Sequence, residues 1–233
     1  MSNLEKYRSL LTEVDALLLT GRVNRMYAAQ YGIAEGVCVI TRDEAFYFTD
    51  GRYIEAAQNN LEGFTALIVD REHPYTDRIN DVIAKYTVKT LGFEEAELTY
   101  AEYQRYSAKL HAVLVPYQDK LDAPRAAKEP WELERMRAAQ KVTDKVFAEL
   151  LDVIHAGMTE KELEAELIYR LYKYGAEEPS FDPIVVSGPN TSLPHGVAGQ
   201  RELAYGDFVT MDFGARVDGY CADMTRTVAL GFV

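Results

Sequence analysis

A predicted β-hairpin near the C-terminal end of the chain carries the residues with the clearest chemical potential. Asp212 and Asp223 stand on either side of Asp218-Gly219, a dipeptide typical of a two-residue type I′ turn, which needs positive φ at both positions. With that turn, Asp212 pairs with Thr225 and Asp223 pairs with Gly214. Because side chains alternate between the faces of a strand, both carboxylates belong to one face.

These two carboxylates are predicted to be diagonal neighbours, about 7–8 Å apart at the backbone. Carboxylates held that close repel each other unless a proton or a cation lies between them. Two metal ions about 3.5–4 Å apart would fit, with Asp212 and Asp223 reaching them from neighbouring strands. Gly214 beside them is expected to leave a gap the size of a side chain. The alternative is a pair of solvated strand aspartates, and a one-residue bulge would move one of them to the opposite face.

The same register assigns the other hairpin residues to two faces of different character. Beside the two aspartates, the first face carries mostly polar side chains: Thr210, Arg216, Cys221, Thr225 and Thr227. The second face is mostly apolar and suited to packing on helices: Val209, Met211, Phe213, Ala215, Ala222, Met224, Arg226 and Val228. Cys221 is expected to fill space rather than to bind metal, because hard oxygen sites do not favour thiolates.

His195 is the histidine with the strongest case for a functional role. It lies in a loop between Pro194 and Gly196, and these neighbours restrict the backbone around it. A histidine held in this way suits a hydrogen-bond donor or a proton shuttle. The alternative is an ordinary solvated loop histidine.

The elements that must position these residues indicate two domains, over 1–122 and 123–233. The first domain alternates short strands with helical patterns, which predicts an α/β domain with a mixed sheet flanked by helices. Strands are expected at 16–20, 36–41, 45–49, 65–69 and 113–115, and helices at 54–60, 76–86 and 100–111.

The second domain is predicted to begin after a hinge over 120–129. A helix from Pro130 to about Ile154 is expected, because proline suits the first helical turn. Thr159 and Glu162 have the spacing of a capping box for a second helix, with Gly175 just past its end. Strands are expected at 184–186, 208–213 and 220–230, with a strand pattern that runs on to Val233.

The composition excludes several classes of function. Lys and Arg total 25 against 37 Asp and Glu, for a net charge of −12, which disfavours binding to nucleic acid or to anionic membranes. No apolar run has the roughly 18 residues of a membrane span, and the N-terminus has no signal pattern. Two cysteines, Cys38 and Cys221, do not provide a disulfide framework, so a cytoplasmic location is expected.

Several motifs resemble those of the Xaa-Pro aminopeptidases and Xaa-Pro dipeptidases, the pita-bread metallopeptidases. In the second half they are Phe181–Gly188, Pro194–Gly196, Asp212–Gly214 and Asp223–Thr227. The first half resembles the creatinase-like N-terminal domain of this family, at Asp15–Leu19, Thr49–Tyr53 and Arg125–Lys128. The resemblance implies a creatinase-like N-terminal domain followed by the first part of an α+β pita-bread domain.

The resemblance also implies a metal-dependent reaction. Family members bind two divalent ions, commonly Mn²⁺ with Co²⁺ or Zn²⁺ possible, through two Asp, one His and two Glu. Asp212 and Asp223 match the two aspartates, and His195 matches a histidine that contacts substrate. The implied substrates are short peptides with proline in second position, and the implied assembly is a homodimer or higher oligomer.

The family's remaining His and two Glu ligands follow the position of Asp223, whereas this sequence ends at Val233. Two carboxylates do not fill the roughly six-oxygen shell of a hard divalent ion. We therefore expect a C-terminally truncated peptidase that is inactive or nearly so on its own. A non-catalytic binding module and a creatine-type amidinohydrolase of the same fold are the alternatives. The choice between dipeptidase and aminopeptidase stays open.

Overall fold

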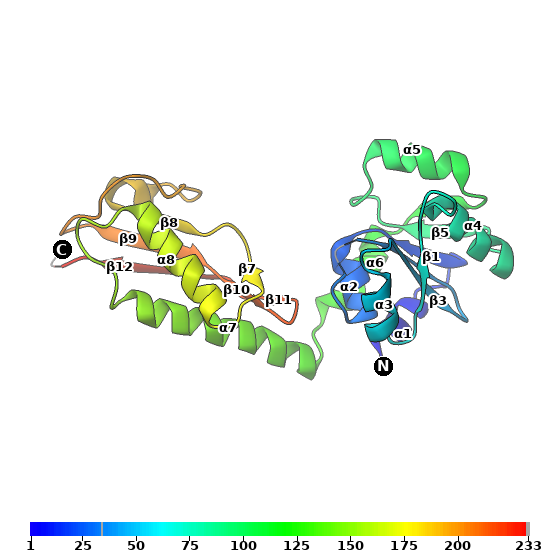
Figure 1. Cartoon of the computed structure of the whole chain (residues 1–233), viewed down its shortest axis with the longest axis horizontal. Coiled ribbons are helices and arrows are strands. Elements are labelled where there is room, and N and C mark those ends of the chain that lie inside the picture. Colours follow the sequence, from blue (N-terminus) through cyan, green and yellow to red (C-terminus); the bar gives the residue numbers. More distant parts are fainter. Residues whose placement is uncertain (34, 232–233) are drawn as a thin grey trace. The chain divides into compact units, whose positions relative to one another are not determined.

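The computed structural model describes residues 1–33 and 35–231, which form two compact units (Figure 1). The first unit is Met1–Ala127 and the second is Lys128–Val233. The predicted boundary at 122/123 falls inside a helix, Gln118–Ala126, so the division lies a few residues later. In the described part of the chain, no helix combines the length and apolarity that crossing a membrane requires.

The first unit is built on a six-stranded mixed sheet with the order β4-β3-β2-β1-β5-β6. Its strands are β1 (Ala16–Leu19), β2 (Val37–Ile40), β3 (Ala45–Thr49), β4 (Thr65–Ile68), β5 (Thr90–Phe93) and β6 (Val113–Pro116). Its helices are α1 (Asn3–Arg8), α2 (Arg22–Ala29), α3 (Ile54–Asn60), α4 (Tyr75–Tyr86), α5 (Tyr100–Lys109) and α6 (Gln118–Ala126). The mixed sheet flanked by helices confirms the predicted α/β class, while α1, α2, α6 and β5 were not predicted.

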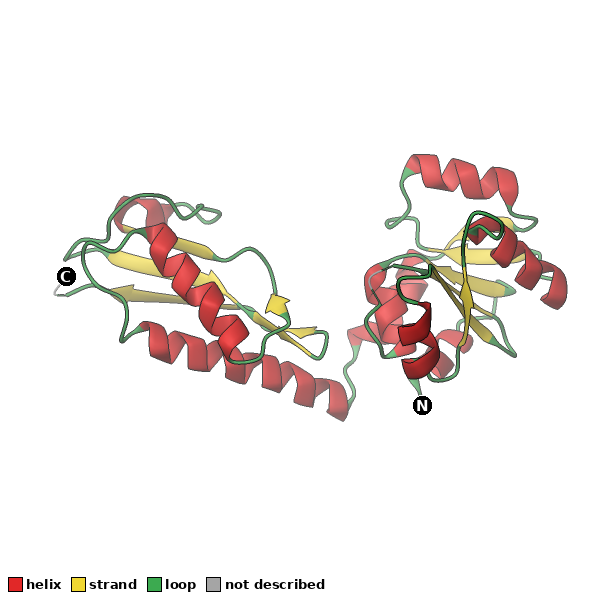
Figure 2. Ribbon diagram, viewed as in Figure 1, coloured by secondary structure: helices red, strands yellow, loops and turns green. Residues whose placement is uncertain are grey.

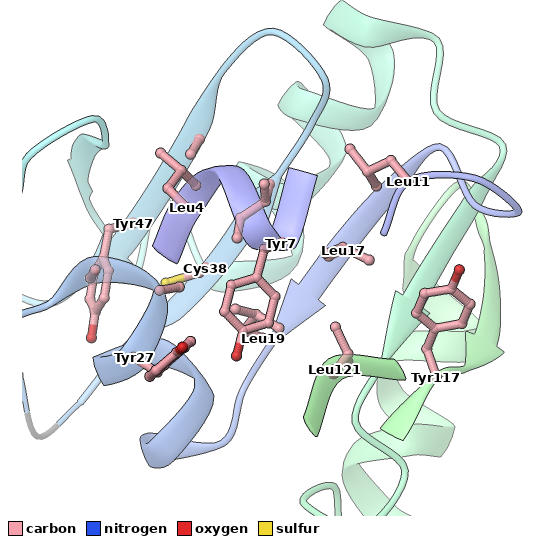
Figure 3. Close-up of a cluster of buried hydrophobic side chains, with 14 of the residues drawn as sticks. Leu4, Tyr7, Leu11, Leu17, Leu19, Tyr27, Cys38, Tyr47, Tyr117 and Leu121 are labelled. Carbon is pink, nitrogen blue, oxygen red and sulfur yellow. The ribbon is translucent and has the colours of Figure 1, made fainter. Parts of the chain in front are cut away.

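Helices cover both faces of the sheet in this unit (Figure 2), so its central strand β1 is buried on both sides. All four of its residues are buried. Leu17 and Leu19 belong to a core shared with α1, α2 and α6, which Figure 3 shows around Tyr7 and Leu121. Ala16 and Leu18 belong to a second core with α4 and α5. A strand buried on both faces is expected to be continuously apolar, as this one is.

The predicted hinge over 120–129 is wrong for most of its length, because α6 occupies it as far as Ala126. Pro124 disfavours a helix locally, since proline removes a backbone donor. Tertiary contacts outweigh this cost. Leu121 is fully buried in the core, and Arg125 Nε donates to Asn24 Oδ1 at 2.7 Å.

The second unit packs two helices against two three-stranded sheets. Its helices are α7 (Pro130–Leu150) and α8 (Glu160–Lys173), with a 3₁₀ helix η1 (Gly188–Ser192). Its strands are β7 (Glu178–Pro179), β8 (Ile184–Ser187), β9 (Phe208–Phe213), β10 (Ala215–Val217), β11 (Tyr220–Cys221) and β12 (Met224–Ala229). The sheet orders are β11-β10-β7 and β12-β9-β8. The predicted strand pattern ends at Ala229, and Phe232 and Val233 lie outside the described residues.

The helix boundaries of the second unit follow the capping chemistry in the sequence. The predicted capping box between Thr159 and Glu162 is present at the start of α8, and Gly175 adopts φ +90° just past its end. Helix α7 starts at Pro130 as predicted but ends at Leu150 rather than near Ile154. The core between helices and sheets includes Val146, Leu167, Val209, Met211 and Phe213.

Candidate metal-binding hairpin

The hairpin that carries the two aspartates has the predicted turn and register. Asp218 and Gly219 both have positive φ, 48° and 78°, as a type I′ turn requires. Near the turn Arg216 pairs with Cys221, and further along Thr225 pairs with Asp212. The two ladders are in one register, so no residue is inserted between them. The alternative with a bulge, which would have turned one aspartate away, is therefore wrong.

On the polar face of this hairpin, side chains form hydrogen bonds across the two strands. The Thr225 hydroxyl donates to Asp212 Oδ1 at 2.5 Å, and the hydroxyls of Thr210 and Thr227 lie 2.9 Å apart. On the opposite face Val209, Met211, Phe213 and Ala215 are fully buried. The helices thus cover the apolar side, and the side with Asp212 stays accessible within the described residues. Arg226, which the register assigned to the apolar face, is exposed.

The hairpin ladder is interrupted at Gly214, between β9 and β10. A Cβ on Gly214 would lie 1.8 Å from the carbonyl oxygen of Ala222. The predicted gap beside Gly214 is therefore wrong, because the backbone of Ala222 occupies that space. Glycine is needed at this position because the backbones of the two hairpin strands approach each other closely.

Asp223 lies directly after this close approach, between β11 and β12. Its side chain is exposed, whereas those of Ala222 and Met224 on either side are buried. Asp223 is therefore accessible to solvent, as is Thr225, whose hydroxyl reaches Asp212.

The carboxylates of Asp212 and Asp223 are of the chemical type that binds hard divalent cations. Neither Asp212 nor Asp223 forms an ion pair with any described residue, so their carboxylates are not committed to a basic partner. Carboxylate oxygens are the ligands that Mg²⁺ and Mn²⁺ prefer. In number the set is incomplete, because the described residues contain no cluster of three or more His, Cys, Asp or Glu side chains able to hold a metal. Within the described residues, the two aspartates therefore do not make a complete metal site.

His195 lies in a loop that packs on the same side of the sheet. Val186 pairs with Thr210, two residues before Asp212, so Val186 shares the face of Asp212. A Cβ on Gly196 would lie 2.7 Å from Val186 Cγ1, which places the residue after His195 directly against this face. The His195 side chain itself is exposed.

Glu160 is a buried residue near the site that the sequence did not mark as functional. The carboxylate of this first residue of α8 accepts hydrogen bonds from residues flanking the His195 loop. Burial raises the pKa of this carboxyl, but hydrogen bonds from Asn190, Ser187 and Gly199 outweigh burial and hold the pKa below its ordinary value. From the sequence alone, an acidic residue in the first helical turn is explained by the helix dipole. Only the folded structure reveals its contacts.

Comparison with known proteins agrees with this two-unit architecture. Residues 4–127 match the Creatinase/Prolidase N-terminal domain, and residues 134–233 match metallopeptidase family M24. The first match covers more than half of the chain. The chain therefore belongs to the family of the Creatinase/Prolidase N-terminal domain, and its second unit is similar to metallopeptidase family M24.

Individual relatives support the same assignment. The uncharacterized peptidase YqhT of Bacillus subtilis is 37% identical over 231 residues, which are 98% of this chain and 65% of that protein. The structure of an Xaa-Pro dipeptidase from Bacillus anthracis matches with a TM-score of 0.93 and 34% identity, over 99% of this chain and 65% of that one. An X-Pro aminopeptidase from Thermotoga maritima MSB8 matches with a TM-score of 0.90 and 30% identity, over 100% of this chain and 66% of that one.

These matches confirm the predicted fold: a creatinase-like N-terminal domain followed by the first part of a pita-bread domain. They also confirm the predicted family, that of the Xaa-Pro peptidases. The chain spans about 65% of the length of these relatives.

Proposed function

We propose that this chain is the front portion of a metal-dependent peptidase that hydrolyses the bond before proline at the N-terminus of short peptides. Asp212 and Asp223 are its metal ligands, and His195 contacts the substrate. The observation that supports the proposal is the hairpin register, in which Arg216 pairs with Cys221 and Thr225 pairs with Asp212. In this register the alternation of side chains assigns Asp212 and Asp223 to one face, and among the described residues neither forms an ion pair.

The aspartates and their neighbours have separate tasks in this proposal. Asp212 and Asp223 hold divalent ions, Mn²⁺ by family resemblance, and the Thr225 hydroxyl fixes the orientation of Asp212. When bound, such ions supply Lewis acidity and lower the pKa of water. The further His and two Glu that the resemblance implies are assigned to sequence beyond Asp223.

His195 is assigned to hydrogen bonding with the substrate carbonyl as negative charge develops on its oxygen. Donors placed at a developing oxyanion typically contribute about 10²–10³-fold to the rate. Its support is the packing of Gly196 against Val186, which puts the loop on the aspartate side of the sheet. A cytoplasmic location and a homodimeric or higher assembly complete the proposal.

The test compares the 233-residue chain with a longer protein, in which the C-terminal third of the 37% identical relative is joined to it. Both are incubated with Mn²⁺ and a peptide with proline in second position. We expect hydrolysis by the longer protein and little or none by the shorter one, because two carboxylates provide too few ligands. Cleavage of dipeptides compared with longer peptides then separates a dipeptidase from an aminopeptidase.

Matched variants identify the ligands. Asp212→Asn and Asp223→Asn in the longer protein should each abolish hydrolysis. Asp218→Asn is the control, because it removes an exposed carboxylate from the turn of the same hairpin and asparagine tolerates positive φ. A folded longer protein that binds Mn²⁺ but cleaves no such peptide would reject the proposal in favour of a non-catalytic role. Hydrolysis of creatine instead would favour an amidinohydrolase.

A further inference from the structure

Glu160 is connected to both ends of the loop that carries His195. One carboxylate oxygen accepts from the Ser187 backbone N–H at 2.7 Å, from the Ser187 hydroxyl at 2.8 Å and from Asn190 Nδ2 at 3.1 Å. The other accepts from the Gly199 N–H at 3.1 Å. The residue is completely buried, so water does not compete for these bonds.

Arg201 makes a second set of contacts with the start of the same loop. Arg201 Nη1 donates to the Ser187 hydroxyl at 2.6 Å and to Asp207 at 2.7 Å. The backbone N–H of Glu160 donates to the Arg201 carbonyl at 3.0 Å. Gly188 lies so close to the ion pair of Arg201 and Asp207 that a Cβ on Gly188 would be 2.5 Å from Arg201 Nη2. The start of the loop is thus held between Glu160 and Arg201.

Within the loop, a short series of backbone hydrogen bonds leads from Asn190 to His195. The Leu193 N–H donates to the Asn190 carbonyl at 3.0 Å, and the Gly196 N–H donates to the Leu193 carbonyl at 3.1 Å. His195 lies between the last two of these residues. Its backbone position therefore depends on where Asn190 is fixed, and Glu160 binds the side chain of Asn190.

We propose that Glu160 is a positioning residue, whose buried carboxylate holds the loop from Ser187 to Gly199 so that His195 stays over the aspartate side of the sheet. The assignment of a substrate to His195 rests on the proposed function, but the anchoring itself does not. Glu160 acts only through the loop and touches no reacting atom.

The test measures backbone order in the 233-residue chain, without metal or peptide. Order parameters from ¹⁵N relaxation are determined for His195 and Gly196 in the native chain and in Glu160→Gln. The amide group keeps the shape of the side chain but turns one acceptor into a donor. We expect order parameters near 0.85 in the native loop and below about 0.6 in the variant, with at least roughly tenfold faster hydrogen exchange at the Gly199 amide.

Two controls separate positioning from general loss of stability. Glu164→Gln changes another buried glutamate of α8, whose side chain has one described bond, to Lys161. Leu167→Ala destabilises the core that α8 shares with the sheet. Neither should lower the order of His195. Equal disorder of this loop in Leu167→Ala would overturn the proposal, and so would unchanged order in Glu160→Gln.

Asn190→Ala gives the answer if Glu160→Gln does not fold. It removes the side chain that connects Glu160 to the middle of the loop and leaves the bonds to Ser187 and Gly199 in place. Lower order at His195 supports the positioning role, and native order contradicts it. Because none of these measurements uses catalysis, a loop that loosens as expected in a protein that cleaves no peptide would reject the proposed function and leave the anchoring intact.

Discussion

The close approach of the two hairpin strands at Gly214 makes a sharp prediction about stability. In Gly214→Ala the new Cβ would lie 1.8 Å from the Ala222 carbonyl oxygen and 2.5 Å from its carbon. These are backbone atoms that do not rotate away, so the strands must separate. Separation disturbs the bond from the Ala222 N–H to the Ala215 carbonyl, 2.9 Å long, and the bond from the Ala215 N–H to Thr143, 3.0 Å long.

Each of these bonds contributes about 1 kcal/mol, and overpacking adds roughly 1–3 kcal/mol. We therefore expect Gly214→Ala to lower the free energy of unfolding of the second unit by about 3–5 kcal/mol. The assay is urea unfolding followed by tryptophan fluorescence. Trp131 is the only tryptophan in the sequence, and its ring lies 6.0 Å from that of Tyr220 on the same hairpin, so the signal reports on the affected region.

Gly199→Ala is the matched control, because its Cβ would meet nothing closer than 3.6 Å. It should shift the unfolding midpoint little. An unchanged midpoint for Gly214→Ala would refute the reasoning, since the two hairpin strands could then separate at this position without a loss in the free energy of unfolding.

Thr225→Val removes the hydroxyl that orients Asp212 and should weaken Mn²⁺ binding of the longer protein by roughly tenfold, measured by calorimetry; unchanged affinity contradicts this role. Because the pKa of Glu160 is lowered by folding, its ionised form stabilises the second unit above the unfolded pKa of about 4.3, and this contribution is lost as pH falls through the folded pKa. The difference in free energy of unfolding between the native protein and Glu160→Gln should therefore become smaller in acid. A constant difference from pH 7 to pH 3 would contradict stabilisation by the ionised Glu160 carboxylate. Asn24→Ala should destabilise the first unit by about 2–4 kcal/mol in thermal unfolding, because Asn24 is buried and donates to Glu94 at 2.7 Å; a change below about 0.5 kcal/mol would show that these bonds contribute little.

Local patterns allowed much of the fold to be predicted. The Asp218-Gly219 turn and the strict alternation of side chains were sufficient to predict which residue faces Asp212. The helix start at Thr159 was equally predictable, because the capping box involves residues only three positions apart.

Features that depend on distant residues were not predictable. Glu160 and Ser187 are 27 positions apart, and nothing in either local sequence indicates the bond between them. Helix α6 was missed because Pro124 disfavours a helix locally, whereas the buried Leu121 and the contact of Arg125 with Asn24 favour it only in the folded unit. Glycine at 214 was recognised, but its reason is the backbone of Ala222 rather than an open space.

The central claim is that Asp212 and Asp223 bind the same divalent ions. It is tested most directly by anomalous diffraction at the manganese edge, from crystals of the longer protein grown with Mn²⁺. We expect two peaks about 3.5–4 Å apart, with an oxygen of each aspartate about 2.0–2.3 Å from at least one of them. Absence of manganese between the two side chains, or manganese bound by only one of them, would contradict the account.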